Sequence, residues 1–290
     1  MAGIFDLDQL YKGNQWISDK STMQYSLAGP WQLSPLTDLS LPQADIYFPN
    51  PLSHVLPLGL SETELAKQEW HLMHDIEVDE HLLAFAALDL VIAGIDYFAE
   101  VRLNGVAIFD CDRTQSCYVK EIRSLLTIGR NRLEILFLQQ EEEWLIDEPV
   151  CPLDRATLKP HDDRIGLWRA PYLQCLSHLR LEHITTEQVW HHGGGCELIV
   201  TIHFTTYRSG LVSACVGFDG MTYHLPIDMR SDHVTAIFQV DAPRYYDIEQ
   251  PNQADLYSLD VKLDQQQVSL QLALSDTLCV THFPLHHLSM

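Results

Sequence analysis

The segment Leu90–Phe109, LVIAGIDYFAEVRLNGVAIF, carries the clearest fold signal in the chain. Within it, Ala99–Leu103 alternates apolar and charged side chains, which is the period-two pattern of a strand with one buried face. Asn104-Gly105 follows at once, and this dipeptide between alternating apolar residues is a strong hairpin signal. Val106–Phe109 is therefore expected to return antiparallel to the first strand.

The same rhythm recurs along the chain, with apolar runs separated by Gly, Pro, Asn and Asp. Further strands are predicted at 88–92, 133–137, 172–181, 198–207, 211–218, 222–229, 235–240, 257–263, 268–274 and 278–283. Helical signals are confined to 61–70 and a short turn at 121–126. The sequence thus predicts an all-β fold, and its last seven strands have the number and length of an immunoglobulin-like sandwich. We place the boundary between Arg180 and Thr186, giving domains 1–183 and 184–290.

Charge excludes several function classes. Among 290 residues, 18 Lys and Arg stand against 40 Asp and Glu, so the formal net charge is −22. Nucleic-acid binding needs a basic surface, and anionic membranes repel a chain of this charge. Neutral ligands such as sugars remain compatible with it.

The sequence also indicates a compartment. MAGIFDLDQL, at the start, lacks the basic and apolar regions of a secretory signal, and the apolar run Leu82–Ile95 falls short of the roughly 20 residues of a membrane span. The 7 cysteines form no CxxC pair. Reduced thiols in a cytoplasmic protein are therefore expected.

Residues 139–166 lack apolar periodicity and are predicted to form a long loop of the kind that often carries function. Its Glu141–Glu143 run precedes Trp144, and paired carboxylates about 5–9 Å apart are the machinery of glycoside hydrolysis. Consecutive strand residues point to opposite faces, however, so a solvated acidic surface is the favoured interpretation. At the end of this loop, Asp162 and Asp163 precede Trp168; turn formation explains the acids most simply, whereas carboxylates beside an aromatic ring also suit a sugar site.

Two groups of histidines contain residue types that metal ions bind. His191, His192 and Cys196 surround Gly193–Gly195, but zinc sites use two spaced ligand pairs, so a hairpin turn is favoured. The second group is expected to be solvated or in the last strand; it comprises His282, His286 and His287. No phosphate-binding, dinucleotide-binding or nucleophile-elbow motif occurs, and neither a metal nor a cofactor is expected.

Several stretches, in the right order, resemble the N-terminal half of glycoside hydrolase family 2, most closely its β-mannosidase branch. The most specific is Leu90–Phe109, which is close to the family's L-x-F-x-G-x-D-x-x-A-x-V-x-L-N-G-x-x-I. The others are 26–31, 48–56, 70–78, 116–133, 166–171 (GLWRAP) and 253–259. The resemblance implies a jelly-roll, galactose-binding-like sandwich followed by an immunoglobulin-like sandwich. In that family a (β/α)8 barrel of roughly 250 residues comes next and holds both catalytic glutamates, whereas this sequence ends at Met290.

The resemblance also implies site residues. Positions 112–114 match a loop that reaches the sugar in relatives, and an Asp before the G-I-W-R motif touches substrate. The substrate-binding candidates are Asp112, Arg113, Asp162, Asp163, Trp168 and Arg169, and no residue is expected to be catalytic. The W-D-W-G-P sequence of the mannosidase branch is missing, so no particular sugar is implied.

Three functions follow as expectations. The first is a non-catalytic carbohydrate-binding or accessory protein. The second is a docking module for a separate catalytic chain or for a homo-oligomer, because domains that pack on a barrel leave apolar surface without it. The third is a fragment or subunit of an active glycosidase acting on β-mannosides or β-galactosides. No nucleic-acid or membrane partner is expected.

Overall fold

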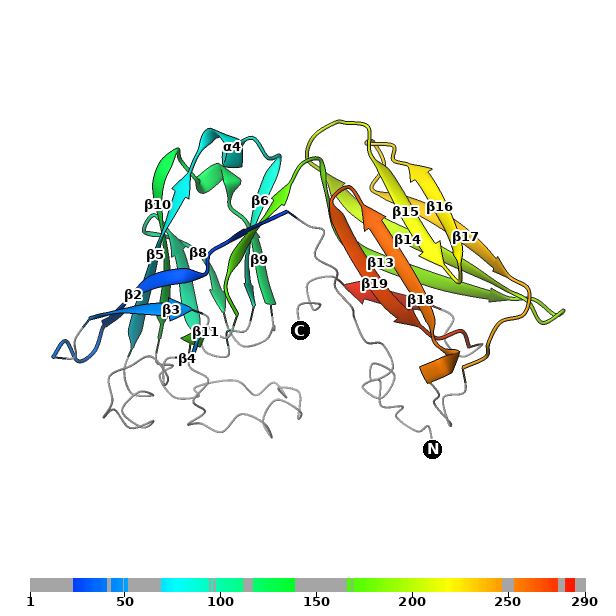
Figure 1. Ribbon diagram of the computed structural model, residues 1–290, viewed down its shortest axis with the longest axis horizontal. Helices are drawn as coiled ribbons and strands as arrows, with labels where there is room; N and C mark the ends of the chain where they lie inside the picture. The colour runs from blue at the N-terminus through cyan, green and yellow to red at the C-terminus, as the bar shows by residue number, and fades with distance from the viewer. Residues whose placement is uncertain are drawn as a thin grey trace, which may run out of the picture. The chain divides into compact units, whose positions relative to one another are not determined.

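A computed structural model describes residues 23–40, 43–48, 50–51, 69–93, 95, 98–111, 117–138, 166–167, 169–246, 253–275 and 280–284 (Figure 1). These residues divide into two compact units between Cys175 and Leu176, referred to below as the first and second domains. Almost all regular structure is antiparallel β-sheet, so the all-β fold is confirmed. The domain bounds 1–183 and 184–290 remain a prediction. Among the residues described, no helix has the length and apolarity to cross a membrane.

The first domain is a sandwich of two antiparallel sheets. The larger sheet has the order β3-β2-β5-β10-β7-β8, and these strands span Ala44–Phe48, Gly29–Pro35, Trp70–Val78, Gly129–Phe137, Ala99–Leu103 and Val106–Cys111. The smaller sheet has the order β1-β12-β6-β9, with strands at Gln24–Ser26, Tyr172–Leu176, Ala87–Ala93 and Cys117–Glu121. A two-stranded ladder joins β11 (Gly166–Leu167) to β4 (Asn50–Pro51).

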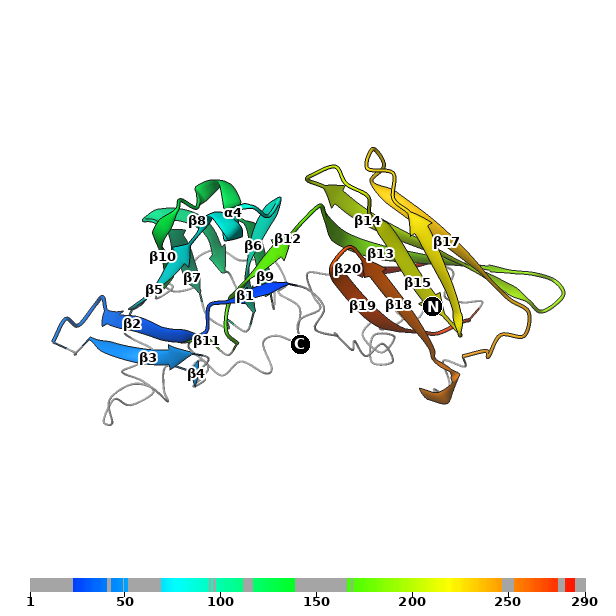
Figure 2. The same ribbon diagram turned by 45° about the horizontal axis from the view of Figure 1, so that its top comes forward.

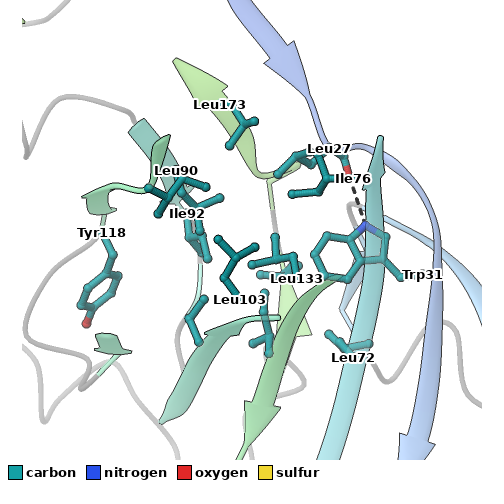
Figure 3. Close-up of a cluster of buried hydrophobic side chains, with 14 of the residues drawn as sticks. Leu27, Trp31, Leu72, Ile76, Leu90, Ile92, Leu103, Tyr118, Leu133 and Leu173 are labelled. Carbon is teal, nitrogen blue, oxygen red and sulfur yellow. Dashed lines mark hydrogen bonds between the residues drawn. The ribbon is translucent and has the colours of Figure 1, made fainter. Parts of the chain in front are cut away.

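The core of the first domain lies between these sheets, where alternate residues of each strand meet. Leu72, Leu103 and Leu133 of the larger sheet face Leu90 and Leu173 of the smaller one (Figure 3). The Trp31 indole is also buried there, and its Nε1 donates a hydrogen bond to the Leu27 carbonyl oxygen at 3.1 Å. The amphipathic alternation read from the sequence therefore does bury one face of each strand.

A short helix, α4 (Glu80–Leu83), precedes β6 and was not predicted. Asp79 caps it, because its Oδ1 accepts a hydrogen bond from the Leu82 backbone N–H at 2.7 Å. The Arg123 guanidinium donates to the Leu83 and Phe85 carbonyl oxygens at the other end of the helix. Arg123 itself begins the 3-10 helix η1 (Arg123–Leu125), which lies inside the predicted turn at 121–126. The helix predicted at 61–70 is wrong at its end, since Trp70 begins β5; residues 61–68 lie outside the described residues.

The predicted Asn104-Gly105 hairpin is confirmed between β7 and β8. Asn104 and Gly105 have φ of 52° and 79°, the left-handed pair that a two-residue hairpin turn requires. Asn131 on β10 is fully buried beside this turn and accepts a 3.0 Å hydrogen bond from the Asn104 side-chain amide. This hydrogen bond therefore connects the tip of the hairpin to β10.

The second domain is also a two-sheet sandwich. One sheet has the order β17-β14-β13-β20, with strands at His233–Val240, Cys196–Thr206, Leu179–Trp190 and Val280–Pro284 (Figure 2). The other has the order β16-β15-β18-β19, with strands at Met221–Pro226, Ser213–Phe218, Tyr257–Leu263 and Gln266–Leu272, and the 3-10 helix η2 (Gln253–Asp255) precedes β18. Phe218, Phe238 and Tyr257 pack together in its core.

Two buried glutamine side chains connect the sheets of the second domain. The Gln266 amide oxygen accepts from the Leu181 N–H, and its amide nitrogen donates to the Leu179 carbonyl, both at 3.0 Å. Gln188 bonds in the same way to the Ala273 carbonyl at 2.9 Å and the Ser275 N–H at 3.0 Å. The predicted strand at 172–181 is corrected here, because it is two strands, β12 and β13, and β13 continues to Trp190.

Candidate functional site

One end of the first domain gathers the ends of several strands. Along the larger sheet, Pro35 pairs with Trp70, Trp70 with Phe137, Phe137 with Ala99, and Ala99 with Cys111. These residues therefore form one row across the sheet. The chain segments 52–68, 94–97, 112–116 and 139–165 adjoin this row in the sequence.

The smaller sheet contributes to the same end. Ala93, the last residue of β6, pairs with Cys117, the first residue of β9. Ile95, just beyond β6, forms a bridge with Leu167 of β11, and both side chains are buried. Leu167 in turn pairs with Asn50 of β4. The attachment points of the predicted sugar-binding segments thus lie at one end of the sandwich, which we call the loop end.

Most of the sequence-predicted site residues fall outside the described residues. These are Asp112, Arg113, Asp162, Asp163 and Trp168. Asp112 and Arg113 follow the buried Cys111 directly in the sequence, while Asp162 and Asp163 precede β11 and Trp168 follows it. Arg169 is described and exposed. Their joint role in binding a sugar stays a prediction.

Arg169 lies near a half-buried phenol. Burial raises the pKa of Tyr172 to about 12, a negative charge at Cys117 would raise it further, and the Arg169 guanidinium lowers it. Tyr172 and Cys117 also pack together with Val91 and Ala93 on the outer side of the smaller sheet. The phenol therefore stays protonated at neutral pH and can donate or accept a hydrogen bond beside the Arg169 cation.

The glycine-rich segment 193–195 makes the predicted hairpin. The His191 N–H donates to the Gly195 carbonyl at 2.9 Å, and Trp190 pairs with Cys196 across the turn. Cys196 is fully buried, while the His191 imidazole lies 3.4 Å from the Glu197 carboxylate. Within the described part of the chain, no group of three or more His, Cys, Asp or Glu residues is arranged to hold a metal ion. Glu141–Glu143 and Trp144 lie outside that part, as do His286 and His287.

Sequence reasoning missed a row of histidines on the second domain. His183, His203 and His233 pair across β13, β14 and β17, and His282 of β20 lies beside His183. The signal in the sequence is a histidine at an outward position of each strand. These histidines can be recognised as neighbours only once the register of strands far apart in the sequence is known.

A known family model matches part of the first domain. Residues 50–149 match the family model described as glycosyl hydrolase 2 galactose-binding domain-like. The resemblance to glycoside hydrolase family 2 is confirmed. The matched segment runs from β4 through β10, so it contains every residue of the row of strand ends except Pro35, and two of the candidate residues, Asp112 and Arg113.

Solved structures support the same fold. The β-D-mannosidase of Dictyoglomus thermophilum aligns with a TM-score of 0.60 and 17% identity, over 83% of this chain and 34% of that one. The β-glucuronidase of Ruminococcus gnavus aligns with a TM-score of 0.57 and 12% identity, over 89% and 46%. A family 2 β-galacturonidase from Eisenbergiella tayi, bound to galacturonate, aligns at 0.54 and 15%, over 89% and 44%.

The chain resembles the N-terminal domains of family 2 glycosidases and spans less than half the length of these solved structures. At such low identity the alignments establish the fold alone. None of the curated proteins matches the sequence.

Proposed function

We propose that this chain binds carbohydrate at the loop end of its first domain and acts as an accessory, non-catalytic part of glycoside metabolism. The observation that supports this most directly is the row of strand ends that runs from Pro35 to Cys111. That row anchors both segments holding the candidate residues, within a domain that matches a galactose-binding-like family model.

The types of the candidate residues suit a sugar. Carboxylates such as Asp112, Asp162 and Asp163 accept hydrogen bonds from hydroxyl groups, and an arginine such as Arg113 donates to ring and hydroxyl oxygens. The Trp168 indole offers an apolar face of the kind that packs on the C–H face of a pyranose ring. The net charge of −22 repels acidic ligands at long range, so neutral sugars are the favoured class over uronates.

The test is titration of the full chain with methyl galactosides and methyl mannosides, with glucuronate and galacturonate as charged counterparts. Binding is followed by calorimetry and by saturation transfer to the ligand. We expect a neutral sugar to bind and Asp163→Asn to weaken its binding by about tenfold to a hundredfold, because a lost charge-assisted hydrogen bond costs roughly 1.5–3 kcal/mol. Trp168→Ala should weaken binding similarly by removing the apolar platform.

Asp45→Asn is the matched control. Asp45 is exposed on the edge strand β3. It pairs with Gln32, the middle residue of β2, away from the row of strand ends. The Asp45→Asn variant should bind the sugar with the affinity of the wild type. Absence of binding by every sugar, or equal weakening by Asp45→Asn and Asp163→Asn, would refute the proposal.

A second candidate is that the chain is a fragment or subunit of an active glycosidase acting on β-mannosides or β-galactosides. It is favoured by the names of the similar structures, which are glycosidases, and by the 34–46% of their length that the chain spans. Purified chain assayed on a panel of nitrophenyl glycosides tests it, and turnover abolished by Asp163→Asn would support it over the accessory role.

Association with a catalytic chain or a second copy is the third candidate, and light scattering of the purified chain distinguishes a monomer from an oligomer. We also propose that the second sandwich is immunoglobulin-like, on the basis of its two four-stranded antiparallel sheets. A cytoplasmic location is proposed because all five described cysteines are free thiols.

A further inference from the structure

The outer face of the sheet β17-β14-β13-β20 carries four histidines side by side. His183 and His203 stack with ring centroids 4.2 Å apart and ring planes 14° apart. His282 lies 4.6 Å from His183, and His233 lies 5.9 Å from His203. Each histidine comes from a different strand, so the arrangement depends on the register of the whole sheet. We call these four residues the histidine row.

A β-bulge positions the centre of the row. The pairing of β13 with β14 shifts between Leu181 and His183, so that Glu182 is the extra residue. The side chain of Gln266 holds the Leu181 N–H and the Leu179 carbonyl immediately before this shift. The position of His183 against His203 is therefore fixed by buried hydrogen bonds rather than by the rings alone.

Few carboxylates among the described residues lie where they could offset positive charge on the central rings of the histidine row. Glu182 lies beside His183 on the same strand, but its carboxylate is 3.8 Å from the Arg180 guanidinium. The carboxylate of Asp232, the residue before β17, lies 2.7 Å from Nδ1 of His233 at the exposed end of the row.

Two neutral residues of the described part of the chain also adjoin the central rings. Thr185 of β13 contacts His203, with 3.4 Å between Oγ1 and Nε2, and Pro284 of β20 pairs with His183. The two central rings thus mainly face other histidines.

Protonating this row is unfavourable in the folded domain. Burial lowers the pKa of His183, as do the neighbouring His203 and His282, whereas Glu182 raises it. Burial also lowers the pKa of His203, as do His233 and His282, while Asp232 raises it. An imidazolium stacked on a neutral imidazole is tolerable, but a second proton on the adjacent ring meets a like charge.

We propose that the histidine row makes the second domain sensitive to mild acid, loosening the sheet that carries it when the row becomes protonated. This inference is independent of sugar binding at the loop end of the first domain. The two edge strands β17 and β20 each contribute one ring to the row. They are the elements that like-charge repulsion would separate first, because each has a partner strand on one side alone.

The direction of the pH effect follows from linkage. Because the pKa values of His183 and His203 in the folded domain lie below 6.5, the ordinary value for histidine, their contribution to stability is complete above that pH. It is lost as the pH falls through their lower, folded-state pKa values. Histidine is the side chain whose charge changes in this range, so the effect belongs to mildly acidic conditions rather than to carboxylate protonation.

A metal site is the competing use of such a cluster. Ligation needs imidazole nitrogen lone pairs that converge on one point about 2.0–2.1 Å from each nitrogen. Stacked rings whose planes are 14° apart direct their in-plane lone pairs alongside one another instead. The histidine row therefore fits proton binding better than metal binding.

The experiment compares the full-length wild type with His203→Gln and His282→Gln at about pH 7.5 and pH 5, the two sides of histidine titration. The denaturant midpoint of the second domain is measured from the histidine ring resonances. We expect the denaturant midpoint of the wild type to fall on acidification. In both variants the midpoint should fall by about half as much or less. In His203→Gln the titration midpoint of the His183 ring should also rise, because one neighbouring charge has been removed.

His224→Gln is the matched control, since His224 is exposed on β16 in the opposite sheet. It should retain the wild-type pH dependence. An unchanged pH dependence in both His203→Gln and His282→Gln, or an equal change in His224→Gln, would overturn the proposal. A Zn²⁺-dependent rise of the wild-type midpoint at neutral pH that His203→Gln removes would also overturn it, by identifying a metal site.

Discussion

The Asn104 side-chain nitrogen donates a 3.0 Å hydrogen bond to Oδ1 of Asn131, joining the tip of one hairpin to the start of the neighbouring strand. Asn131 has no solvent exposure, and its amide also donates to the carbonyls of Thr127 and Gly129 and accepts from the Thr127 N–H. This one side chain therefore satisfies backbone groups on both sides of the turn that begins β10.

Replacing Asn131 with Ala should destabilise the first domain strongly. Two carbonyls and one N–H lose a buried partner, and each unsatisfied group costs about 1–3 kcal/mol, so the total is about 3 kcal/mol or more. Urea unfolding followed by the fluorescence of the buried Trp31 and Trp70 measures it. Asn104→Gly keeps the positive φ and loses fewer bonds, and it should cost about 1 kcal/mol. A loss in Asn131→Ala no larger than in Asn104→Gly would contradict this reasoning.

Replacing Gln266 with Leu should destabilise the second domain. The shape is nearly conserved, but the Leu181 N–H and the Leu179 carbonyl would be left in the interior without the amide. We expect a loss of about 2 kcal/mol in the free energy of unfolding, measured by denaturant titration. Gln267→Leu, at the adjacent half-buried position on β19, controls for the added apolar surface and should change stability by less than about 0.5 kcal/mol.

Tyr172 should ionise well above neutral pH. Its pKa of about 12 lies above 10.0, the ordinary value for tyrosine, so the stabilisation by the protonated phenol is complete below pH 10.0 and is lost as the pH rises toward 12. Tyrosinate absorbance in the ultraviolet should show a late step that Tyr172→Phe removes. Arg169→Gln should move the step to still higher pH, because the cation that favours the phenolate is gone. Loss of amplitude from the main transition in Tyr172→Phe would show that the phenol is not shielded.

The described cysteines should differ in how fast a thiol reagent modifies them. Burial raises the pKa of Cys175 to about 11 and also raises that of Cys196, and the thiolate is the reactive form. Cys111 and Cys117 are buried as well, whereas Cys215 is half-exposed on β15. Iodoacetamide followed by mass spectrometry should modify Cys215 well before these four. Early modification of Cys175 or Cys196 would contradict their burial.

Much of the fold was predictable because its strongest signals are local. The β7–β8 hairpin was found from one alternating run and an Asn-Gly pair, which are sufficient to define it. The helix expected at 61–70 was wrong at Trp70, where packing of the indole in the sheet outweighs the upstream capping signal. Strands β12 and β13 were merged, because the bend at Ser177 and His178 contains no Gly or Pro to mark it.

The candidate sites were less accessible to sequence reasoning. Asp112 and Asp163 were selected by resemblance, and they lie outside the described residues, so their role as sugar ligands is still a prediction. The histidine row could not be predicted, because His183 and His282 become neighbours only through the pairing of β13 with the last strand. Contacts between residues about a hundred positions apart depend on register, which a single sequence does not specify.

The two cysteines that bracket residues 112–116 have an engineering consequence. Cys111 ends β8 with its side chain in the core, and Cys117 begins β9 with its side chain packed on the outer side of the smaller sheet, at exposures of 1% and 4%. A replacement peptide grafted between them would inherit two fixed anchors and would leave the packed interior untouched. The first domain could thus serve as a display scaffold, in which new recognition sequences are inserted and screened while the rest of the fold is kept.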